Sequence, residues 1–274
     1  MGTLYIVATP IGNLDDITVR ALRVLSEVSL IAAEDTRHSR RLLTHFAIDT
    51  PMISYHEHNQ RERREKLLLA IAAGDVALIT DAGTPGISDP GADLVRVALQ
   101  AGHQVSPIPG PSSLAAAVSV SGLIEGPFTM LGFLPRERSE RLPMLGHAAA
   151  SGWPLVIFET APRLRETLAH VVDAMGDRQA VVARELTKLH EDVRAGTLVE
   201  LLQWASEVDL RGEIVLVIGA GRHEPSDVPD ALDVLRTLRR SGLSASKAAR
   251  EAAAITGLPR SELYQLALGL DTPA

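Results

Sequence analysis

Cysteine is absent from the sequence, which excludes disulfide bridges, thiolate metal sites and a cysteine nucleophile. Aromatic residues are scarce at 3%, so the cores must be built mainly from Ala, Val, Leu and Ile. No stretch approaches the ~18 uninterrupted apolar residues of a membrane span. The apolar run Leu4–Ala8 is also too short for a signal peptide. We therefore expect a cytoplasmic protein, in a reducing compartment, without a membrane partner.

An excess of positive charge is also missing. The formal net charge is −7, which argues against a protein that grips nucleic acid through its bulk charge and leaves room only for a local basic surface. The length of 274 residues allows one large domain or two ordinary ones with a small appendage.

Several common active-site motifs do not occur. No G-x-G-x-x-G or G-x-x-x-x-G-K-S loop is present, which argues against a dinucleotide oxidoreductase or a nucleoside triphosphatase. There is no G-x-S-x-G nucleophile elbow and no H-E-x-x-H metal pair. His56 and His58 lie in a polar segment with Asn59. This segment could be a metal site or a polar loop facing a substrate, and we expect the loop and no metal.

Short β-branched runs alternate with longer segments of helical periodicity, which predicts an α/β architecture with largely parallel sheets. One helix is expected to start with Asp89 as its N-cap and Pro90 in its first turn. The strand-like runs are Leu4–Ala8, Val28–Ala33, Val76–Thr80, Gln104–Ile108, Phe128–Phe133, Leu155–Phe158, Ala180–Arg184 and Ile214–Ile218.

The pattern divides the chain into three parts. We expect one α/β domain over residues 1–122 and a second over residues 123–224, with a short join that brings them together around a cleft. The pattern after Asp227 is purely helical. We expect residues 228–274 to form a small helix-turn-helix-like appendage, because Thr256-Gly257 separates two helical segments.

Three loops rich in Gly and Pro follow predicted strands: Ala8–Asp16, Asp81–Gly91 and Pro107–Ser113. Ligands bind beyond the carboxyl ends of strands in doubly wound sheets, and glycine lets the backbone approach a ligand closely. The alternative is that the loops are only tight connections with capped helices, in which Ser112 or Ser113 serves as an N-cap.

Charged side chains follow two further strands. Glu34 and Asp35 precede Arg37, and Glu185 precedes Lys188. Paired carboxylates at a strand end can act as a general base or bind a cation. The plainer interpretations are a capped helix start for the first segment and an ordinary polar connection for the second.

These segments occur in an order that resembles one known family. Val7–Ile17, Glu34–Arg37, Asp81–Gly91, Pro109–Ser112 and Glu185–Lys188 are similar to motifs of the bacterial 16S ribosomal RNA cytidine-2′-O-methyltransferases. This family belongs to the tetrapyrrole methylase superfamily, the class III S-adenosylmethionine-dependent enzymes. The resemblance covers roughly residues 3 to 221. Related tetrapyrrole methylases carry Gly-Asp-Pro where this chain has Gly83-Thr84-Pro85, which favours the RNA branch.

The resemblance implies two α/β domains of tetrapyrrole-methylase type, a cofactor cleft between them and a small C-terminal helical domain. It implies methyl transfer from S-adenosylmethionine to the ribose 2′-hydroxyl of a cytidine in the decoding region of 16S rRNA, within the small ribosomal subunit. A neutral ribose hydroxyl is a poor nucleophile, so its proton must be removed, and we expect Glu34, Asp35 and Lys188 as candidates for proton removal or orientation. The implied substrate contacts are Arg37, His56 and Asn59. The implied cofactor contacts are Pro10, Gly83, Thr84, Ile87, Ser112, Ser113, Phe158 and Leu186.

We further expect a homodimer and no DNA partner. RNA would have to bind local basic patches, namely Arg37, Arg40 and Arg41; Arg61, Arg63 and Arg64; and Arg136, Arg138 and Arg141. Two alternatives stay open at this point. The same fold could serve a small-molecule methyltransferase of the tetrapyrrole kind, or the C-terminal helices could make the chain a nonenzymatic RNA-binding module.

Overall fold

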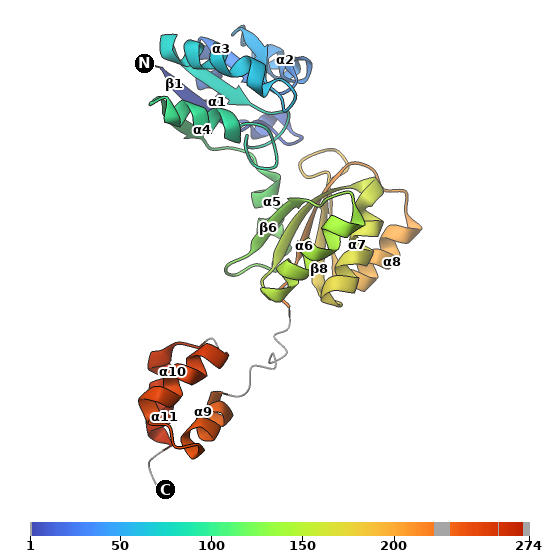
Figure 1. Ribbon diagram of the computed structural model, residues 1–274. Helices are drawn as coiled ribbons and strands as arrows, with labels where there is room; N and C mark the ends of the chain where they lie inside the picture. The colour runs from blue at the N-terminus through green and yellow to red at the C-terminus, as the bar shows by residue number, and fades with distance from the viewer. Residues whose placement is uncertain (1, 222–230, 257, 271–274) are drawn as a thin grey trace. The chain divides into compact units, whose positions relative to one another are not determined.

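The structure is a computed structural model that describes residues 2–221, 231–256 and 258–270. The chain separates into two compact units, Met1–Gly221 and Arg222–Ala274. Figure 1 follows the chain through the sheets of the first unit and then through the helices of the second. The expected boundaries at residues 224 and 228 lie outside the described residues, as does Gly257 of the expected helix break.

The first sheet is parallel throughout, with the strand order β3-β2-β4-β1-β5. All four residues of the central strand β4 are buried, as expected of a strand covered on both faces. The strands are β1 (Thr3–Val7), β2 (Leu30–Ala33), β3 (Met52–Ser54), β4 (Val76–Ile79) and β5 (Gln104–Ile108).

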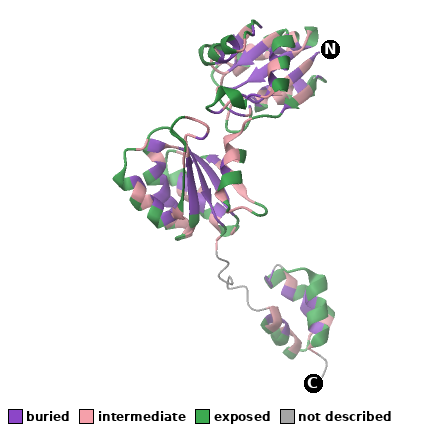
Figure 2. Cartoon of the chain, turned by 180° about the vertical axis from the view of Figure 1, so that it is seen from behind, coloured by how far each residue is buried: buried purple, intermediate pink, exposed green. Residues whose placement is uncertain are grey.

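Two pairs of helices cover this sheet on opposite faces, and their apolar residues form two separate cores. Leu25 and Leu43 of the first pair pack with Ile31 and Ile79. Residues of the second pair, such as Leu67 and Leu94, form the other core. The buried strands between exposed helix surfaces are visible in Figure 2. The first pair is α1 (Val19–Glu27) and α2 (Thr36–His45), and the second pair is α3 (Gln60–Ala73) and α4 (Ala92–Gln100).

The second sheet has the order β6-β7-β10-β8-β9, and only the β6–β7 pair is parallel. The expectation of largely parallel sheets is therefore wrong for this half. A short turn after Arg184 joins β8 to β9 as a hairpin, which must be antiparallel. The strands are β6 (Thr129–Phe133), β7 (Leu155–Thr160), β8 (Gln179–Arg184), β9 (Asp192–Thr197) and β10 (Glu213–Ile218).

The two faces of this second sheet have different covers. Helices α6 (Arg138–Ala150), α7 (Ala161–Met175) and α8 (Leu198–Glu207) enclose one core. Helix α5 (Ser113–Ser121) packs on the other face, where Ala117 meets Val156 and Val217. The expected division at residue 122 assigns α5 to the first part of the chain, although the helix covers the second sheet.

All eight predicted strands occur, with ends displaced by at most two residues. Strands β3 and β9 were not predicted. β3 has only three residues, and β9 is an exposed edge strand with Asp192, Arg194 and Gly196 in its sequence. The predicted helix start at Asp89 is also wrong, because α4 begins at Ala92 after Gly91. Asp89 and Pro90 belong instead to the preceding loop.

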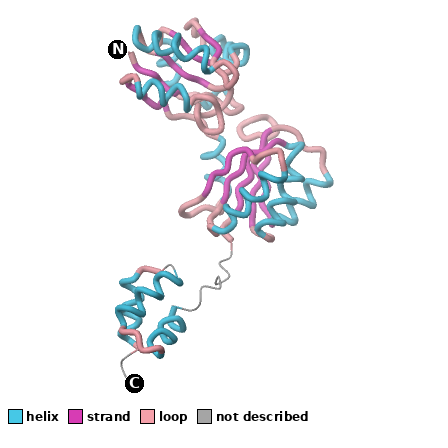
Figure 3. The backbone as a smooth tube through the Cα atoms, in the orientation of Figure 1, coloured by secondary structure: helices cyan, strands magenta, loops and turns pink. Residues whose placement is uncertain are grey.

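The described residues of the second unit form helices joined by loops and include no strand, as Figure 3 shows. Small side chains let these helices approach closely, because Ala248, Ala249 and Ala252 of α10 are fully buried against Leu235 and Leu263. The helices are α9 (Ala231–Arg240), α10 (Ala245–Thr256) and α11 (Arg260–Gly269). The predicted helical pattern of this segment is confirmed.

Candidate active site

A central cavity lies between the strand-end loops of the first sheet and residues of the second sheet. Its empty volume is about 790 Å³, part of it open to solvent. The first half contributes Ile11, Ala82, Gly83, Thr84, Ile87, Ser88, Asp89, Ser112 and Ser113. The second half contributes Phe133, Phe158, Glu159, Ala183, Glu185, Leu186, Lys188, Glu213, Ile214 and Val215.

Hydrogen bonds hold the three Gly/Pro loops together at this edge. The Thr9 amide donates to the Gly83 carbonyl (2.9 Å), and the Gly83 amide donates to the Thr9 carbonyl (3.1 Å). The Thr84 hydroxyl donates to the Pro111 carbonyl at 3.3 Å. Gly83 has φ +81°, a left-handed conformation that a residue with a Cβ adopts only under strain. The loops therefore form one braced wall of the cavity.

The first loop also contacts the turn that joins β8 to β9. A Cβ on Gly12 would lie 2.4 Å from Cγ of Lys188 and 3.0 Å from the Leu186 carbonyl oxygen, so only glycine allows this approach. In the turn itself, Glu185 and Thr187 have positive φ angles of 50° and 65°. Such strain in non-glycine residues clusters at functional sites, and here it presents Leu186 and Lys188 to the cavity.

Lys188 is held by two carboxylates. Its Nζ lies 2.8 Å from Oε1 of Glu185 and 2.9 Å from Oε2 of Glu213. Burial alone would lower the pKa of Lys188, but the two hydrogen-bonded carboxylates outweigh burial and raise the pKa above its ordinary value. The ammonium therefore stays protonated at neutral pH and is suited to orienting a group rather than removing a proton.

A second, polar groove adjoins the central cavity, and Ser88 and Asp89 line both. Glu34 lies in this polar groove, where its Oε2 accepts a hydrogen bond from the Asp81 amide (3.3 Å). The other residues of the polar groove are His56, Glu57, His58, Gln60, Gly86, Pro90, Gly91, Ala92 and Asp93. Carboxylates thus gather where the two spaces meet.

The pKa values of the carboxylates at this junction are raised. Burial, followed by the negative charge of Glu34, raises the pKa of Asp89 to about 6. Burial also raises the pKa of Glu34, against the lowering effect of its hydrogen bond with the Asp81 amide. A carboxylate with a pKa near 6 is a better proton acceptor than an ordinary aspartate and is still ionised at neutral pH.

Asp35 and Arg37 interact mainly with each other. Asp35 is the N-cap of α2 and accepts hydrogen bonds from the Arg37 amide (2.8 Å) and guanidinium (3.0 Å). The hydrogen bond from the Arg37 side chain is the main reason that the pKa of Asp35 falls to about 2. Neither residue lines the central cavity or the polar groove, and the Arg37 side chain is 90% exposed.

The remaining predicted site residues are distributed as follows. Seven of the eight predicted cofactor contacts line the central cavity, whereas Pro10 lines a small separate pocket beside His38 and Asp81. His56 lines the polar groove. Asn59 supports the loop instead, because its amide oxygen accepts from the His56 amide (2.9 Å) and its amide nitrogen donates to the Ser54 hydroxyl (3.1 Å).

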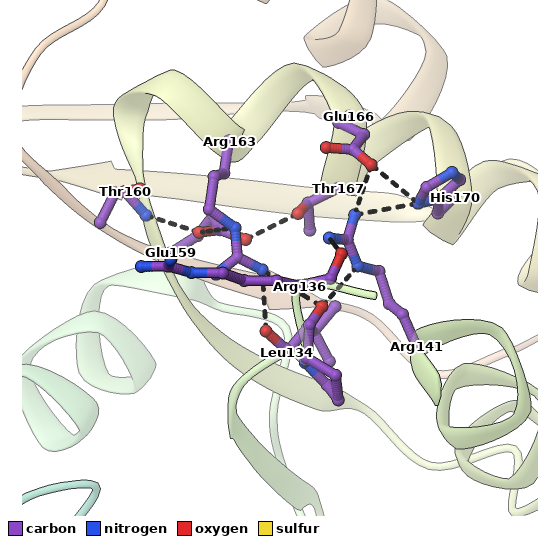
Figure 4. A network of polar contacts seen from close by, with 10 residues as sticks. Leu134, Arg136, Arg141, Glu159, Thr160, Arg163, Glu166, Thr167 and His170 are labelled. Atoms are coloured by element: carbon purple, nitrogen blue, oxygen red, sulfur yellow. Dashed lines mark hydrogen bonds and ion pairs between the residues drawn. The ribbon is translucent and has the colours of Figure 1, made fainter. Parts of the chain in front are cut away.

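A buried polar network supports the wall formed by β6 and β7 (Figure 4). Glu159 lines the cavity and is fully buried, and its carboxylate accepts from the Thr167 hydroxyl (2.7 Å) and pairs with Arg163 (3.3 Å). Arg163 also donates to the Leu134 carbonyl at 2.8 Å. The network therefore ties the chain after Phe133, another cavity residue, to helix α7.

The predicted basic patch at residues 136–141 is wrong in one member. The Arg141 side chain is only 1% exposed and donates to the carbonyls of Pro135 and Arg136 at 2.9 Å each. It also contacts Nδ1 of His170 at 3.0 Å and pairs with Glu166 at 3.1 Å. A residue so enclosed cannot bind RNA, and its role here is to hold the β6–α6 connection.

Sequence reasoning missed Asp89 and Glu159 as cavity residues. Asp89 was interpreted as a helix cap, although it lies in the loop that was singled out for ligand binding. Glu159 lies within the strand β7, in the segment Phe158–Leu164 that also resembles the family, but its sequence position does not show that its carboxylate is buried beside the cavity.

Among the described residues, no group of three or more His, Cys, Asp or Glu side chains could hold a metal ion. Within the same residues, none of the helices combines the length and the apolar character needed to cross a bilayer.

Comparisons with known proteins agree with the architecture. A model of the family Tetrapyrrole (Corrin/Porphyrin) Methylases matches residues 3–202, and one described as RsmI C-terminal HTH domain matches residues 225–271. Over 97% of both chains, the sequence is 50% identical to Ribosomal RNA small subunit methyltransferase I of Pseudomonas aeruginosa. The identity to the protein of that name from Synechocystis is 46% over 99% of both chains.

A solved structure shares the fold at low sequence identity. Uroporphyrin-III C-methyl transferase from Thermus thermophilus, complexed with S-adenyl homocysteine, superposes with a TM-score of 0.57 at 21% identity. The match covers 80% of this chain and 97% of that one. The expected tetrapyrrole-methylase fold with a C-terminal helical domain is confirmed.

Proposed function

Since this chain belongs to the tetrapyrrole methylases and, within them, to the family of Ribosomal RNA small subunit methyltransferase I, we propose a specific reaction for it. It transfers a methyl group from S-adenosylmethionine to the ribose 2′-hydroxyl of a cytidine in 16S rRNA of the small ribosomal subunit. The observation that carries the proposal is the shared wall at Ser88 and Asp89, where the largely apolar central cavity meets a polar groove that can admit the acceptor.

The residues that line the central cavity fit the chemistry of the methyl donor. Apolar side chains such as Phe158, Leu186 and Val215 can cover an adenine ring, while Ser112 and Ser113 offer hydroxyls. The Asp89 carboxylate favours a cationic sulfonium nearby. When bound, the cofactor supplies an electrophilic methyl group and leaves as the neutral thioether after the 2′-oxygen has taken that group.

We assign the acceptance of the hydroxyl proton to Asp89. It lies on the wall shared by the cavity and the groove, so its carboxylate can face a hydroxyl that points toward the donor. Glu34 supports this role through its negative charge, which helps to raise the pKa of Asp89. Lys188, fixed by Glu185 and Glu213, orients the reacting groups.

The other expected site residues keep supporting roles in this proposal. His56 lies in the polar groove and can contact the acceptor nucleotide, and Asn59 holds the backbone of that loop. Asp35 fixes the start of α2 and leaves the exposed Arg37 guanidinium near the surface for a phosphate. Pro10 shapes the first loop from outside the cavity.

Three broader expectations belong to the same proposal. Residues 1–122 and 123–224 act as the two halves of the methyltransferase, and residues 228–274 act as an appendage that helps to bind the subunit. The protein works in the cytoplasm. It forms a homodimer, which sedimentation equilibrium tests directly: a monomer mass at micromolar concentration would remove the dimer from the proposal.

The decisive experiment is transfer of tritiated methyl from S-adenosylmethionine into small ribosomal subunits that lack this modification, followed by nuclease mapping. We expect one labelled nucleotide whose phosphodiester bond resists alkaline cleavage, because that cleavage needs a free 2′-hydroxyl. Label on a base would overturn the 2′-hydroxyl target, whereas no label in the subunit together with methylation of a uroporphyrin would favour the small-molecule alternative.

A further inference from the structure

A third concave surface continues the path from the central cavity. This arginine groove is lined by Glu57, His58, Gln60, Arg61, Arg64, Asp93 and Arg96. Four of these residues, Glu57, His58, Gln60 and Asp93, also line the polar groove. Because the polar groove in turn shares Asp89 with the cavity, the three spaces form a continuous route along the carboxyl edge of the first sheet.

The arginine groove differs in charge from the rest of the chain. Its walls hold three arginines and two carboxylates, whereas the whole protein has a formal net charge of −7. Asp93 pairs with Arg64 at 2.8 Å and with Arg96. Burial by itself would raise the pKa of Asp93, but these two hydrogen-bonded guanidinium groups outweigh burial and lower it. One carboxylate thus holds two cations in place.

The same walls contain polar atoms that lack a partner. Nδ1 of His56, in the polar groove, and Nε of Arg64, in the arginine groove, are buried and make no hydrogen bond within the described residues. The Arg61 side chain is exposed at the mouth and has no ion pair among the described side chains. Buried polar groups in native proteins are nearly always satisfied, and the exposed guanidinium of Arg61 is the donor that a polar ligand can reach.

We infer that the arginine groove holds the phosphodiester backbone of the substrate RNA beside the acceptor nucleotide, with Arg61 and Arg96 against its phosphates. This inference rests on the proposed function. The two ends of the route carry opposite charge, which keeps the phosphates away from the cavity: Glu34 and Asp89 repel phosphate, and the arginines attract it outward. Only the uncharged ribose can then approach the methyl donor.

The test is the double variant Arg61→Gln/Arg96→Gln, compared with wild type by filter binding of unmodified small subunits over a series of KCl concentrations. Each lost phosphate contact lowers the slope of log K against log salt by about 0.7 for single strands. We expect the slope of the double variant to fall by about 1.4. Arg165→Gln, an exposed arginine of α7 outside the three spaces, is the matched control and should keep the wild-type slope.

Removing a negative charge from the arginine groove provides a second test of the inference. Glu57→Gln removes an exposed carboxylate from the groove, so we expect tighter subunit binding, whereas damage to the fold would weaken it. The melting temperature and the calorimetric affinity for S-adenosylmethionine should stay at wild-type values in all variants. A wild-type salt slope in the double variant, or no gain in Glu57→Gln, would overturn the inference.

The same experiments separate this inference from the proposed function. If wild-type protein transfers methyl to the subunit while the double variant binds with an unchanged slope, only the groove assignment is wrong. If wild-type protein binds the subunit but transfers no methyl group to it, the proposed reaction is wrong, and the salt slopes still decide whether the groove binds RNA.

Discussion

Replacing Asp89 by asparagine separates catalysis from stability, because the two should move in opposite directions. Asp89 is partly buried on the wall between the central cavity and the polar groove, with Glu34 and Asp81 as negative neighbours. Its ionised form is therefore disfavoured in the folded protein. Asparagine keeps the shape of the side chain and removes the charge and the ability to accept a proton.

The size of the stability change follows from the pKa of Asp89. Burial raises the pKa of Asp89 from 3.8 to about 6, which at ~1.36 kcal/mol per pKa unit is at most about 3 kcal/mol. Because the side chain is partly exposed, solvent screening reduces this to about 1 kcal/mol. The carboxylate of Asp89 binds its proton more tightly in the folded state than in the unfolded state. The loss of folding stability caused by the ionised carboxylate is therefore absent below pH 3.8 and complete above pH 6.

We therefore expect Asp89→Asn to be about 1 kcal/mol more stable than wild type at pH 8, and about half of that at pH 5. For a unit of this size this corresponds to a rise in melting temperature of about 2–4 °C at pH 8. Differential scanning calorimetry at both pH values measures it. Glu57→Gln, an exposed carboxylate of the same groove, serves as the control and should stay within about 0.5 kcal/mol of wild type.

Methyl transfer should respond in the opposite sense. Wild-type turnover at saturating donor should rise with pH to a plateau above about 6, the pKa of Asp89. Loss of a general base lowers turnover by about 10²–10⁴-fold and removes this pH limb. Wild-type turnover in Asp89→Asn, or a loss of stability that is equal at pH 5 and pH 8, would refute the assignment.

Three further predictions concern other parts of the chain. Gly83→Val should weaken the binding of S-adenosylmethionine measured by calorimetry, and it should lower the free energy of unfolding by roughly 1–2 kcal/mol, because φ is +81° at this position. Gly126→Val is the control, because a Cβ at that position meets open space. Equal affinity for S-adenosylmethionine in both variants would contradict the loop assignment. Arg141→Met should lower the free energy of unfolding by roughly 1–3 kcal/mol, since it leaves the carbonyls of Pro135 and Arg136 without their donors; a urea midpoint equal to that of the exposed Arg138→Met would argue against the network. Deletion of residues 228–274 should weaken subunit binding and flatten its salt slope with donor affinity intact, whereas an unchanged slope would mean that the appendage serves only packing.

Local chemistry was sufficient to predict eight of the ten strands among the described residues. Strands of the first sheet are short, apolar and β-branched, and their polar boundaries at Thr9, Glu34 and Asp81 mark the loops that surround the site. The ligand-binding loops could be found because Gly and Pro residues cluster where parallel strands end. The small alanines of α10 likewise allowed the C-terminal helices to be predicted from the sequence.

Such local signals do not predict how the strands pair with one another. β10 pairs with β7 in a parallel or an antiparallel sense depending on the end of the sheet at which the chain enters after α8. The apolar pattern of the strand is the same in both cases. The edge strand β9 was not predicted from the sequence because none of its residues is buried in a core.

The sequence by itself determined the family, the loops and the kinds of residue available for methyl transfer. Tertiary structure alone decided which of them meet. Asp35 adjoins Glu34 in the chain, yet it is occupied by Arg37 at the start of α2, while Asp89, from another loop, shares the polar groove with Glu34. Charge and burial act through space, so the pKa of a carboxylate is set by neighbours that no local pattern contains.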